Sequence, residues 1–256
     1  MTVKEEIVVR HDGHVAIVQM CRPPHNFVDI EFMAHLADTL EKLDDDTNCR
    51  AVVLTSGVNT FCAGADFGAS SDSTVARDPS PFYRQAMRLF RTKKPIVAAV
   101  RGPAIGAGLG LAVAADFRVT CKEARFSANF LRLGFHPGFG LSFTLPRLIG
   151  QQKAANLFYT GRRIDGEEAV TIGLADELAE LSQVEDRAIA LAKEIAASAP
   201  LAVESTRETM RLGFADQVFK ANQRELQIQL THFPTADFRE GVAAMAERRL
   251  PVFHRK

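Results

Sequence analysis

The sequence lacks an excess of charge of either sign. Lysine plus arginine and aspartate plus glutamate each number 31 among its 256 residues. Without a net basic field, we expect neither a nucleic acid nor a membrane surface as a partner. Long hydrophobic runs are also missing, because the longest uncharged stretch, Gly102 to Ala115, has 14 residues, short of the roughly 20 that a spanning helix needs. Specificity must therefore come from a local site.

Cysteine is scarce and scattered. The four cysteines form neither a C-x-x-C pair nor a zinc-ligand cluster; they are Cys21, Cys49, Cys62 and Cys121. The first ten residues, "MTVKEEIVVR", lack the apolar core of a secretory signal. We therefore expect reduced thiols and a cytoplasmic protein.

His11 and His14, in "HDGH", are the one histidine pair that invites a metal interpretation. They fall in a predicted hairpin turn and have no third ligand nearby in the sequence. Solvent exposure is the favoured interpretation, and no metal is expected.

Hydrophobic spacing predicts a β/α core followed by helices. Strands are expected at residues 6–10, 14–20, 50–56, 95–100, 117–121 and 124–127, and helices at 30–43, 81–92 and 138–148. From Gln151 the pattern is mainly helical, with a turn and short strand near "TIGLADEL", and beyond Pro200 only amphipathic helices follow. No linker separates the expected core, residues 1–197, from the helical region, residues 198–256.

The stretch "RGPAIGAGLGLAVAAD", Arg101 to Asp116, places four glycines where a buried helix should begin. Each glycine inside a helix costs about 1 kcal/mol relative to alanine. The spacing does not give G-x-G-x-x-G, and no lysine follows as a phosphate loop requires. Tight helix–strand packing is one explanation. The other is that ligand atoms approach the backbone, whose first helical N–H groups favour negative charge.

A second turn of small residues, "FCAGAD" from Phe61 to Asp66, also follows a buried strand. Two backbone N–H donors from two such turns, facing one oxygen, would constitute an oxyanion hole.

With these motifs the chain resembles the crotonase superfamily, the enoyl-CoA hydratases and isomerases. The resemblance rests on "CRPPHNFVD", "FCAGADF", "AAVRGPAIGAGLGLAVAAD", "LGFHPGFG" and "EGVAAMAERRLPVF", and covers nearly the whole chain. It implies an α/β fold, a crotonase-like spiral of β-β-α turns with a C-terminal helical oligomerisation region. It also implies a homotrimer or a dimer of trimers.

The same resemblance implies an acyl-CoA thioester as substrate, with no permanently bound cofactor beyond the CoA moiety that the substrate carries. The thioester oxygen would lie between the amides of Ala65 and Ala107. The CoA would contact Pro24, His25, the turn Ala63, Gly64, Ala65, Asp66 and Phe67, and Ala107. Basic tail residues could meet its phosphates, or form only a solvated charge run; they are Arg248, Arg249 and Lys256.

The departures from the family concern proton transfer. Hydratases that resemble this chain carry two glutamates, at places that here correspond to Gly110 and Phe130. Neither residue can transfer a proton, and Phe130 would make its wall of the substrate pocket apolar. Acid and base functions are each worth roughly 100- to 10,000-fold in rate, so a standard hydratase mechanism is not expected.

Other candidates for acid/base chemistry are His136, in "GFHPGFG", and Asp66. For His136 the alternative is a structural histidine, and for Asp66 a carboxylate that caps its own turn. Cys62 lies beside the expected hole, but without a nearby histidine it is interpreted as a small buried thiol. We therefore predict an acyl-CoA-processing lyase or isomerase with nonstandard proton chemistry. The alternative is a noncatalytic acyl-CoA binding or delivery protein.

Overall fold

In the computed structural model, which describes residues 6–65 and 78–256, the chain is built around a mixed sheet of six strands in the order β1-β2-β3-β4-β6-β8. A second, two-stranded sheet pairs β5 with β7. The strands are β1 (Ile7–Asp12), β2 (Val15–Met20), β3 (Ala51–Ser56), β4 (Ile96–Val100), β5 (Pro103–Ile105), β6 (Phe117–Thr120), β7 (Arg125–Ser127) and β8 (Glu177–Leu178).

The hairpin of β1 and β2 is antiparallel, as the "HDG" turn predicts, and the other neighbours in the main sheet are parallel. Every residue of β3 and of β4 is buried. Central strands of a parallel sheet are covered on both faces, so their sequences are continuous apolar runs rather than alternating patterns. This explains why "AVVLTS" and "IVAAV" are recognisable from the sequence.

Helices cover the sheet and fill the second half of the chain. They are α1 (Ile30–Asp45), α2 (Ser80–Arg88), α3 (Ala107–Ala114), α4 (Leu141–Ile149), α5 (Gln151–Thr160), α6 (Gly166–Thr171), α7 (Val184–Ala196), α8 (Pro200–Met210), α9 (Phe214–His232) and α10 (Ala236–Ala246). Short 3₁₀ turns are η1 (Leu89–Arg91), η2 (Asn129–Leu133) and η3 (Leu181–Gln183).

Local chemistry explains where α1 begins. The carboxylate of Asp29 accepts a hydrogen bond from the amide of Phe32 at 2.9 Å and so caps the first turn. The apolar residues that the helical spacing places on one face are buried; they are Phe32, Met33, Leu36, Ala37, Leu40 and Leu43. The predicted amphipathic helix is confirmed and extends to Asp45.

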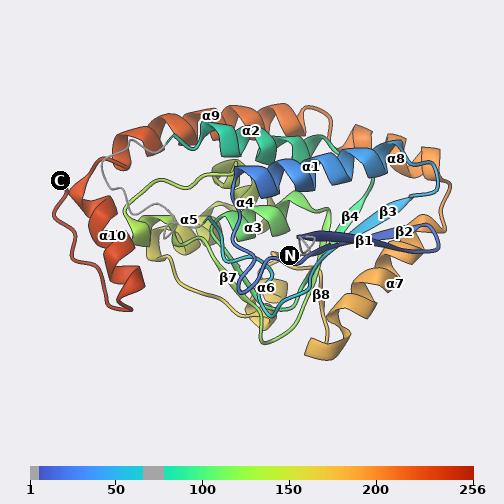
Figure 1. Cartoon of the computed structure of the whole chain (residues 1–256), viewed down its shortest axis with the longest axis horizontal. Helices are drawn as coiled ribbons and strands as arrows, with labels where there is room; N and C mark the ends of the chain where they lie inside the picture. The colour runs from blue at the N-terminus through green and yellow to red at the C-terminus, as the bar shows by residue number, and fades with distance from the viewer. Residues whose placement is uncertain (1–5, 66–77) are drawn as a thin grey trace, which may run out of the picture.

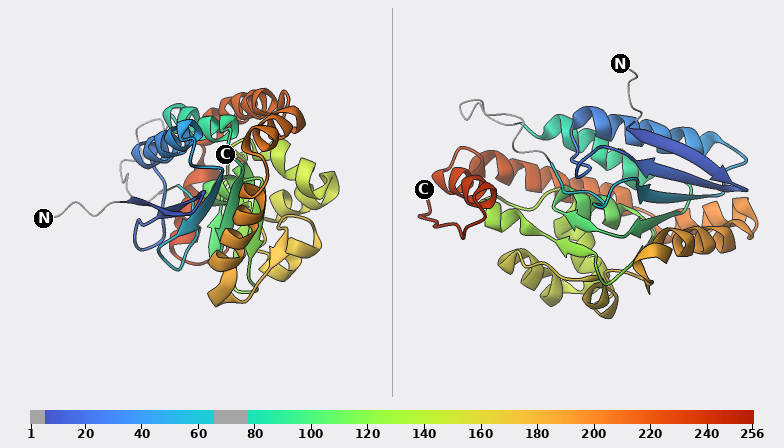
Figure 2. Two further views of the ribbon diagram at one scale, coloured as in Figure 1. Left: turned by 90° about the vertical axis from the view of Figure 1, so that its right-hand side faces the viewer. Right: turned by 60° about the horizontal axis from the view of Figure 1, so that its bottom comes forward.

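The helices lie in two groups around the strands. Figure 1 shows α1, α2 and α9 together along the top, whereas α7 packs against β2, β3, β4 and β6 from below. Figure 2 shows this layering from two further directions. Helix α9 also packs on α4, and α10, at the left of Figure 1, packs on η2. The segments that carry the candidate site, around α3 and η2, are thus enclosed by C-terminal helices.

Two local predictions need correction. Strand β5 was not anticipated, because its three residues lie inside the glycine-rich segment. Helix α4 begins at Leu141 rather than at Gly138. The reason is tertiary: Gly140 has a φ of 72° in the left-handed region, and its amide donates to the buried carboxylate of Glu225 on α9 at 2.7 Å.

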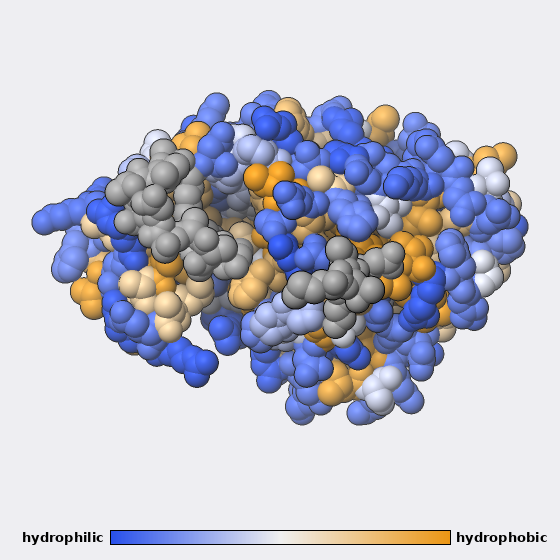
Figure 3. All heavy atoms as spheres, in the orientation of Figure 1, coloured by the Kyte–Doolittle hydropathy of each residue, from blue (hydrophilic) through white to orange (hydrophobic). Residues whose placement is uncertain are grey.

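The surface drawn in Figure 3 is mostly hydrophilic, with separate hydrophobic patches, and it is hollowed between the α10 lobe at the left and the body of the molecule. In the parts of the chain that the structure describes, no helix has the length and apolar character needed to cross a bilayer.

Candidate active site

Two turns that follow buried strands lie side by side. The amide of Ile105 donates to the carbonyl of Cys62 at 3.0 Å, which ties the segment 61–65 to β5. A Cβ atom placed on Gly64 would lie 2.8 Å from the carbonyl oxygen of Ile105 and 3.6 Å from the amide nitrogen of Ala107. The structure therefore brings together the two turns that the sequence marks with small residues.

The glycines at this contact are required by close backbone approach. A Cβ atom on Gly108 would lie 2.0 Å from the carbonyl oxygen of Cys62, a distance that no side chain allows. Gly106, at the N-cap of α3, has a φ of 56° in the left-handed region that glycine adopts without strain. The close approach at Gly108 confirms tight packing as one explanation for this stretch, and the approach of ligand atoms to the backbone stays a prediction.

The amides of Ala65 and Ala107 lie where the two turns meet, at the Ala65–Ala107 junction. Within residues 6–65 and 78–256, neither amide donates to an acceptor. Ala107 is the first residue of α3, where helical N–H groups lack intrahelical partners and carry the positive end of the helix dipole. The junction can therefore offer N–H donors to an oxygen that gains negative charge.

Pro24 and His25 lie along the same junction and are exposed. The amide of Ala63 donates to the carbonyl of His25 at 3.0 Å, and the His25 imidazole Nδ1 lies 3.3 Å from the hydroxyl of Thr60. The structure thus brings Pro24 and His25 beside the turn Ala63–Ala65, as the resemblance implies.

Asn26 is a residue that the sequence interpretation missed. It is fully buried, has a φ of 50°, and its side-chain amide donates to the Ser56 hydroxyl at 2.8 Å and to the carbonyl of Phe61 at 3.1 Å. Its Oδ1 accepts from the amide of Arg22 at 2.7 Å. Asparagine tolerates the left-handed region better than most residues. The position of Asn26 directly after "PPH" was the feature of the sequence from which this role could have been predicted. Asn26 holds the His25 segment against the end of β3.

Gly110 and Phe130, at which the resemblance implies the glutamates of hydratases, are both buried. The Cζ atom of Phe130 lies 4.0 Å from the Cβ position of Gly106, so an apolar ring flanks the α3 turn. The Cβ position of Gly110 lies 2.4 Å from Cγ of Phe139. Phe139 is a second residue that the sequence interpretation missed, because its contact with α3 is tertiary.

His136 makes its polar contacts with α9 and with its own loop. Its Nδ1 lies 2.8 Å from the carbonyl of Pro137, an arrangement that leaves the proton on Nδ1. Its backbone amide donates to Nδ1 of His232 at 3.1 Å, and its carbonyl accepts from Gln229 at 2.8 Å. Burial and the charge of His136 lower the pKa of His232. Within the described residues, the hydrogen bonds of His136 join it to α9 and to its own loop, so they fit the structural alternative.

Cys62 is a small buried thiol, as the sequence interpretation favoured. It is fully buried, its Sγ accepts from the amide of Gly64 at 3.4 Å, and burial raises its pKa to about 12. The four cysteines, all in the described residues, form no disulfide with one another. A thiol with this pKa is almost entirely protonated at neutral pH, so it cannot act as a nucleophile.

His11 and His14 are exposed at the β1–β2 turn, as expected. The Nδ1 of His14 lies 2.9 Å from the carbonyl of Asn48. In the described ranges, no three His, Cys, Asp or Glu side chains are grouped as metal ligands.

Asp66 and Phe67 lie outside the described residues. In the tail, the guanidinium of Arg249 pairs with Glu240 and Glu247, while Arg248 and Lys256 are exposed. Arg249 is therefore engaged within its own subunit.

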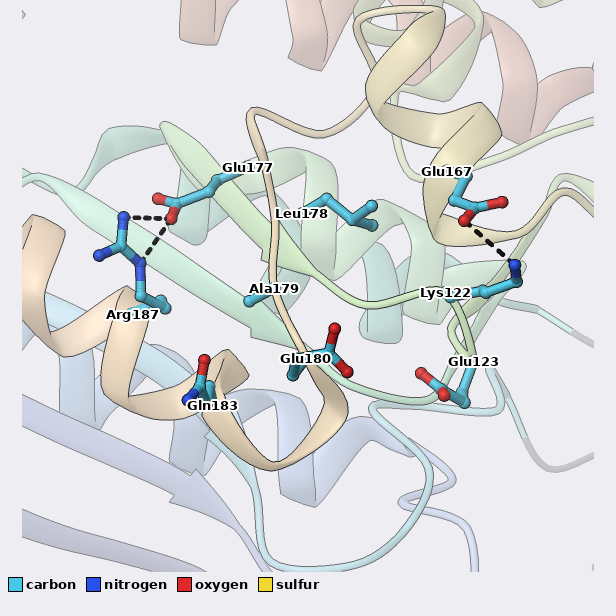
Figure 4. Close-up of a pocket in the computed structure, with 9 residues that line it drawn as sticks. All are labelled: Lys122, Glu123, Glu167, Glu177, Leu178, Ala179, Glu180, Gln183 and Arg187. Carbon is cyan, nitrogen blue, oxygen red and sulfur yellow. Dashed lines mark hydrogen bonds and ion pairs between the residues drawn. The ribbon is translucent and has the colours of Figure 1, made fainter.

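A polar surface cavity of about 540 Å³ lies elsewhere, between β8 and α7. Figure 4 shows its two ion pairs, Lys122 with Glu167 at 3.2 Å and Arg187 with Glu177. The remaining lining residues are Glu123, Leu178, Ala179, Glu180 and Gln183. It includes no residue of the candidate site, and its carboxylates would repel the phosphates of CoA.

Comparisons with known proteins show which family the chain resembles. The family model described as enoyl-CoA hydratase/isomerase matches residues 10–256. The chain is 33% identical to (E)-benzylidenesuccinyl-CoA hydratase of Thauera aromatica over 261 residues, 96% of this chain and 98% of that protein. It is 29% identical to the short-chain-enoyl-CoA hydratase of Clostridium acetobutylicum over 249 residues, 95% of each chain.

Among solved structures, the enoyl-CoA hydratase/isomerase from Pseudoalteromonas atlantica T6c superimposes with a TM-score of 0.88 at 32% identity, covering 98% of this chain and 100% of that one. The predicted crotonase-like α/β fold is confirmed by this match.

Proposed function

Because the chain belongs to the enoyl-CoA hydratase/isomerase family, we propose that it binds an acyl-CoA thioester and stabilises its enolate between the backbone amides of Ala65 and Ala107. Removing a proton next to a thioester, or adding to its conjugated double bond, moves negative charge onto the carbonyl oxygen. The observation that carries the proposal is the contact of the Gly64 turn with the first amide of α3. Donors held there before the reaction cost no reorganisation when the charge develops.

CoA is the group that the substrate brings to this site, and no cofactor remains bound between turnovers. Its adenine and pantetheine would lie along Pro24, His25 and the turn Ala63–Phe67. The described part of this surface is open, because Pro24 and His25 are exposed and Ala63 and Ala65 are partly exposed. Arg248 and Lys256 are available for phosphates, whereas Arg249 is occupied by its ion pairs.

The proposed proton chemistry is nonstandard. Gly110 and Phe130 place no carboxylate beside α3, and Asp66 and His136 are the side chains that could take over acid or base work. The hydrogen bonds of His136 leave its Nε2 for that role. A noncatalytic acyl-CoA binding protein is the second candidate, supported by the same two residues, since it would keep the amides and tolerate the loss of both glutamates.

Solvent deuterium exchange separates the two candidates. We expect the protein, incubated in D₂O with a series of straight-chain acyl-CoAs, to transfer deuterium to the α-carbon of at least one of them, because the hole stabilises the enolate. Mass spectrometry of the recovered acyl-CoA measures the label, with protein-free samples as control. Tight binding throughout the series without label above the control would favour the noncatalytic protein.

The second prediction concerns the oligomeric state of the protein. The proposed helical region, residues 198–256, exposes apolar side chains, including Leu201 at 80%, Met210 at 74% and Leu212 at 83%. A mainly apolar cavity of about 630 Å³ opens beside them, between α8, α4 and the end of α3. Exposed apolar surface of this kind marks contact sites.

We expect light scattering to report a homotrimer or a dimer of trimers at micromolar concentration, and Leu212→Glu to shift the protein towards smaller species. A monomeric wild type would contradict the assembly. We also propose a cytoplasmic location, where thiols stay reduced, which accords with four cysteines that form no disulfide with one another.

A further inference from the structure

The ring of Phe139 occupies the space into which a side chain at position 110 would project. A Cβ atom on Gly110 would lie 2.4, 2.6 and 2.9 Å from Cγ, Cδ1 and Cβ of Phe139. These are distances that real Cβ atoms do not show, so the two residues are size-complementary. Position 110 therefore does not merely lack a carboxylate. The phenyl ring of Phe139 fills the space that a side chain at this position would occupy.

The backbone of Phe139 is held in a conformation that a bulky residue seldom adopts. Its φ is 65°, in the left-handed region, although the side chain is only 1% exposed. Such strain persists where the surroundings determine the conformation, and it is often found at functional sites. The ring is fixed by edge-on contacts with Phe82 and Phe90, each with centroids 6.2 Å apart.

Helix α9 forms hydrogen bonds with the loop on both sides of Phe139. The Glu225 carboxylate accepts from the amide of Gly140 at 2.7 Å and from the amide of Ser142 at 2.8 Å. Gln229, one turn further along, donates to the carbonyl of His136 at 2.8 Å. The backbone that carries Phe139 therefore cannot move away from α3 without breaking these hydrogen bonds.

Phe139 packs against the same helix, α3, whose first amide belongs to the proposed hole. Gly110 follows Ala107 by three residues, so both lie on one face of α3, separated by about 4.5 Å along its axis. The ring of Phe130 reaches the same helix end, at 4.0 Å from the Cβ position of Gly106. Under the proposed function, a thioester whose oxygen met the Ala107 amide would extend its α- and β-carbons along the face of α3 against which Phe139 packs.

We propose that Phe139 determines acyl specificity: its ring narrows the site beside the carbons next to the thioester, so that the protein accepts unbranched acyl groups and rejects α-branched ones. This inference rests on the proposed acyl-CoA function. The methyl branch of an α-substituted acyl group would collide with this ring, which packs against Phe82 and Phe90.

The test compares binding of butyryl-CoA and 2-methylbutyryl-CoA by calorimetry. We expect wild type to prefer butyryl-CoA by about tenfold or more, the effect of one methyl-sized group in a fitted pocket. Phe139→Ala should bind the branched thioester about tenfold more tightly and leave butyryl-CoA within about threefold. Phe139→Gly, which removes the side chain and also relieves the left-handed backbone, provides a second variant if the alanine protein does not fold. Tyr159→Ala, at a site 77% exposed, is the matched control and should change neither affinity.

Equal wild-type affinities for the two thioesters, or an unchanged preference in a folded Phe139 variant, would overturn the specificity role while leaving the acyl-CoA function in place. A folded wild type that binds neither thioester would instead overturn the proposed function and, with it, this inference.

Discussion

Wild-type protein is expected to hydrate crotonyl-CoA very slowly while binding it. If Gly110 and Phe130 stand at the two acid/base positions, as the resemblance implies, roughly 10² to 10⁴ of rate is lost for each proton-transfer function. Binding should suffer less, because the amides of Ala65 and Ala107 do not depend on those side chains. Loss of the ultraviolet absorbance of the conjugated enoyl thioester, or direct product analysis, measures hydration, and calorimetry measures binding.

Fast turnover would be decisive against this expectation. Hydration at roughly ten per second, a typical enzymatic rate, that disappeared in His136→Ala would identify His136 as a replacement catalyst and eliminate the noncatalytic alternative. The same turnover surviving that substitution would show that the acid/base places have been assigned to the wrong residues.

The structure also shows what a variant designed to restore hydration would need. In Gly110→Glu with Phe130→Glu, the new side chain at position 110 would meet the ring of Phe139 at 2.4 Å from its Cβ. Rescue therefore requires Phe139→Ala as a third change. We expect the double variant to remain inactive for this steric reason, and burial to keep part of any new carboxyl protonated.

Replacing Ala107 by proline should remove one donor of the proposed hole. Proline has no backbone N–H, and Ala107 is the first residue of α3, the helical position where proline is best tolerated. Loss of one such donor costs about 3 to 4 kcal/mol in the transition state. We therefore expect α-carbon deuterium exchange to slow by roughly 100- to 1,000-fold in Ala107→Pro.

The carbonyl stretching frequency of a bound acyl-CoA reports the same donor directly. In Ala107→Pro it should return towards the value of the free thioester, whereas Ala107→Gly, which keeps the N–H, should behave as wild type. Equal frequencies in a folded proline variant and the glycine control would reject Ala107 as a donor.

Much of the fold could be predicted because its signals are local. The run "AVVLTS" identifies β3 as a strand buried on both faces, and the "HDG" turn between two apolar runs identifies the β1–β2 hairpin. Apolar spacing and the Asp29 cap identify α1. The candidate hole was predictable in the same way, since small residues after buried strands at Gly64 and Gly106 mark places of close backbone approach.

Other features depend on residues far apart in the sequence. The start of α4 is determined by Glu225, a carboxylate some 85 residues away, which binds the amides at Gly140 and Ser142. Asn26 is understandable only once its side chain is seen to join Met20, Ser56 and the end of the 60–61 segment.

By itself, the sequence determined the family, the order of the main elements, the two small-residue turns and the absence of glutamates at positions 110 and 130. Only the tertiary structure decided what stands in their place. Whether Gly110 opens a cavity or accommodates a neighbour depends on the packing of α4 and α9 around Phe139, and no local pattern encodes that contact. The small size of glycine and alanine, which is visible in the sequence, allows the two turns to approach each other closely. The shape of the site, by contrast, is decided by side chains that meet across the fold.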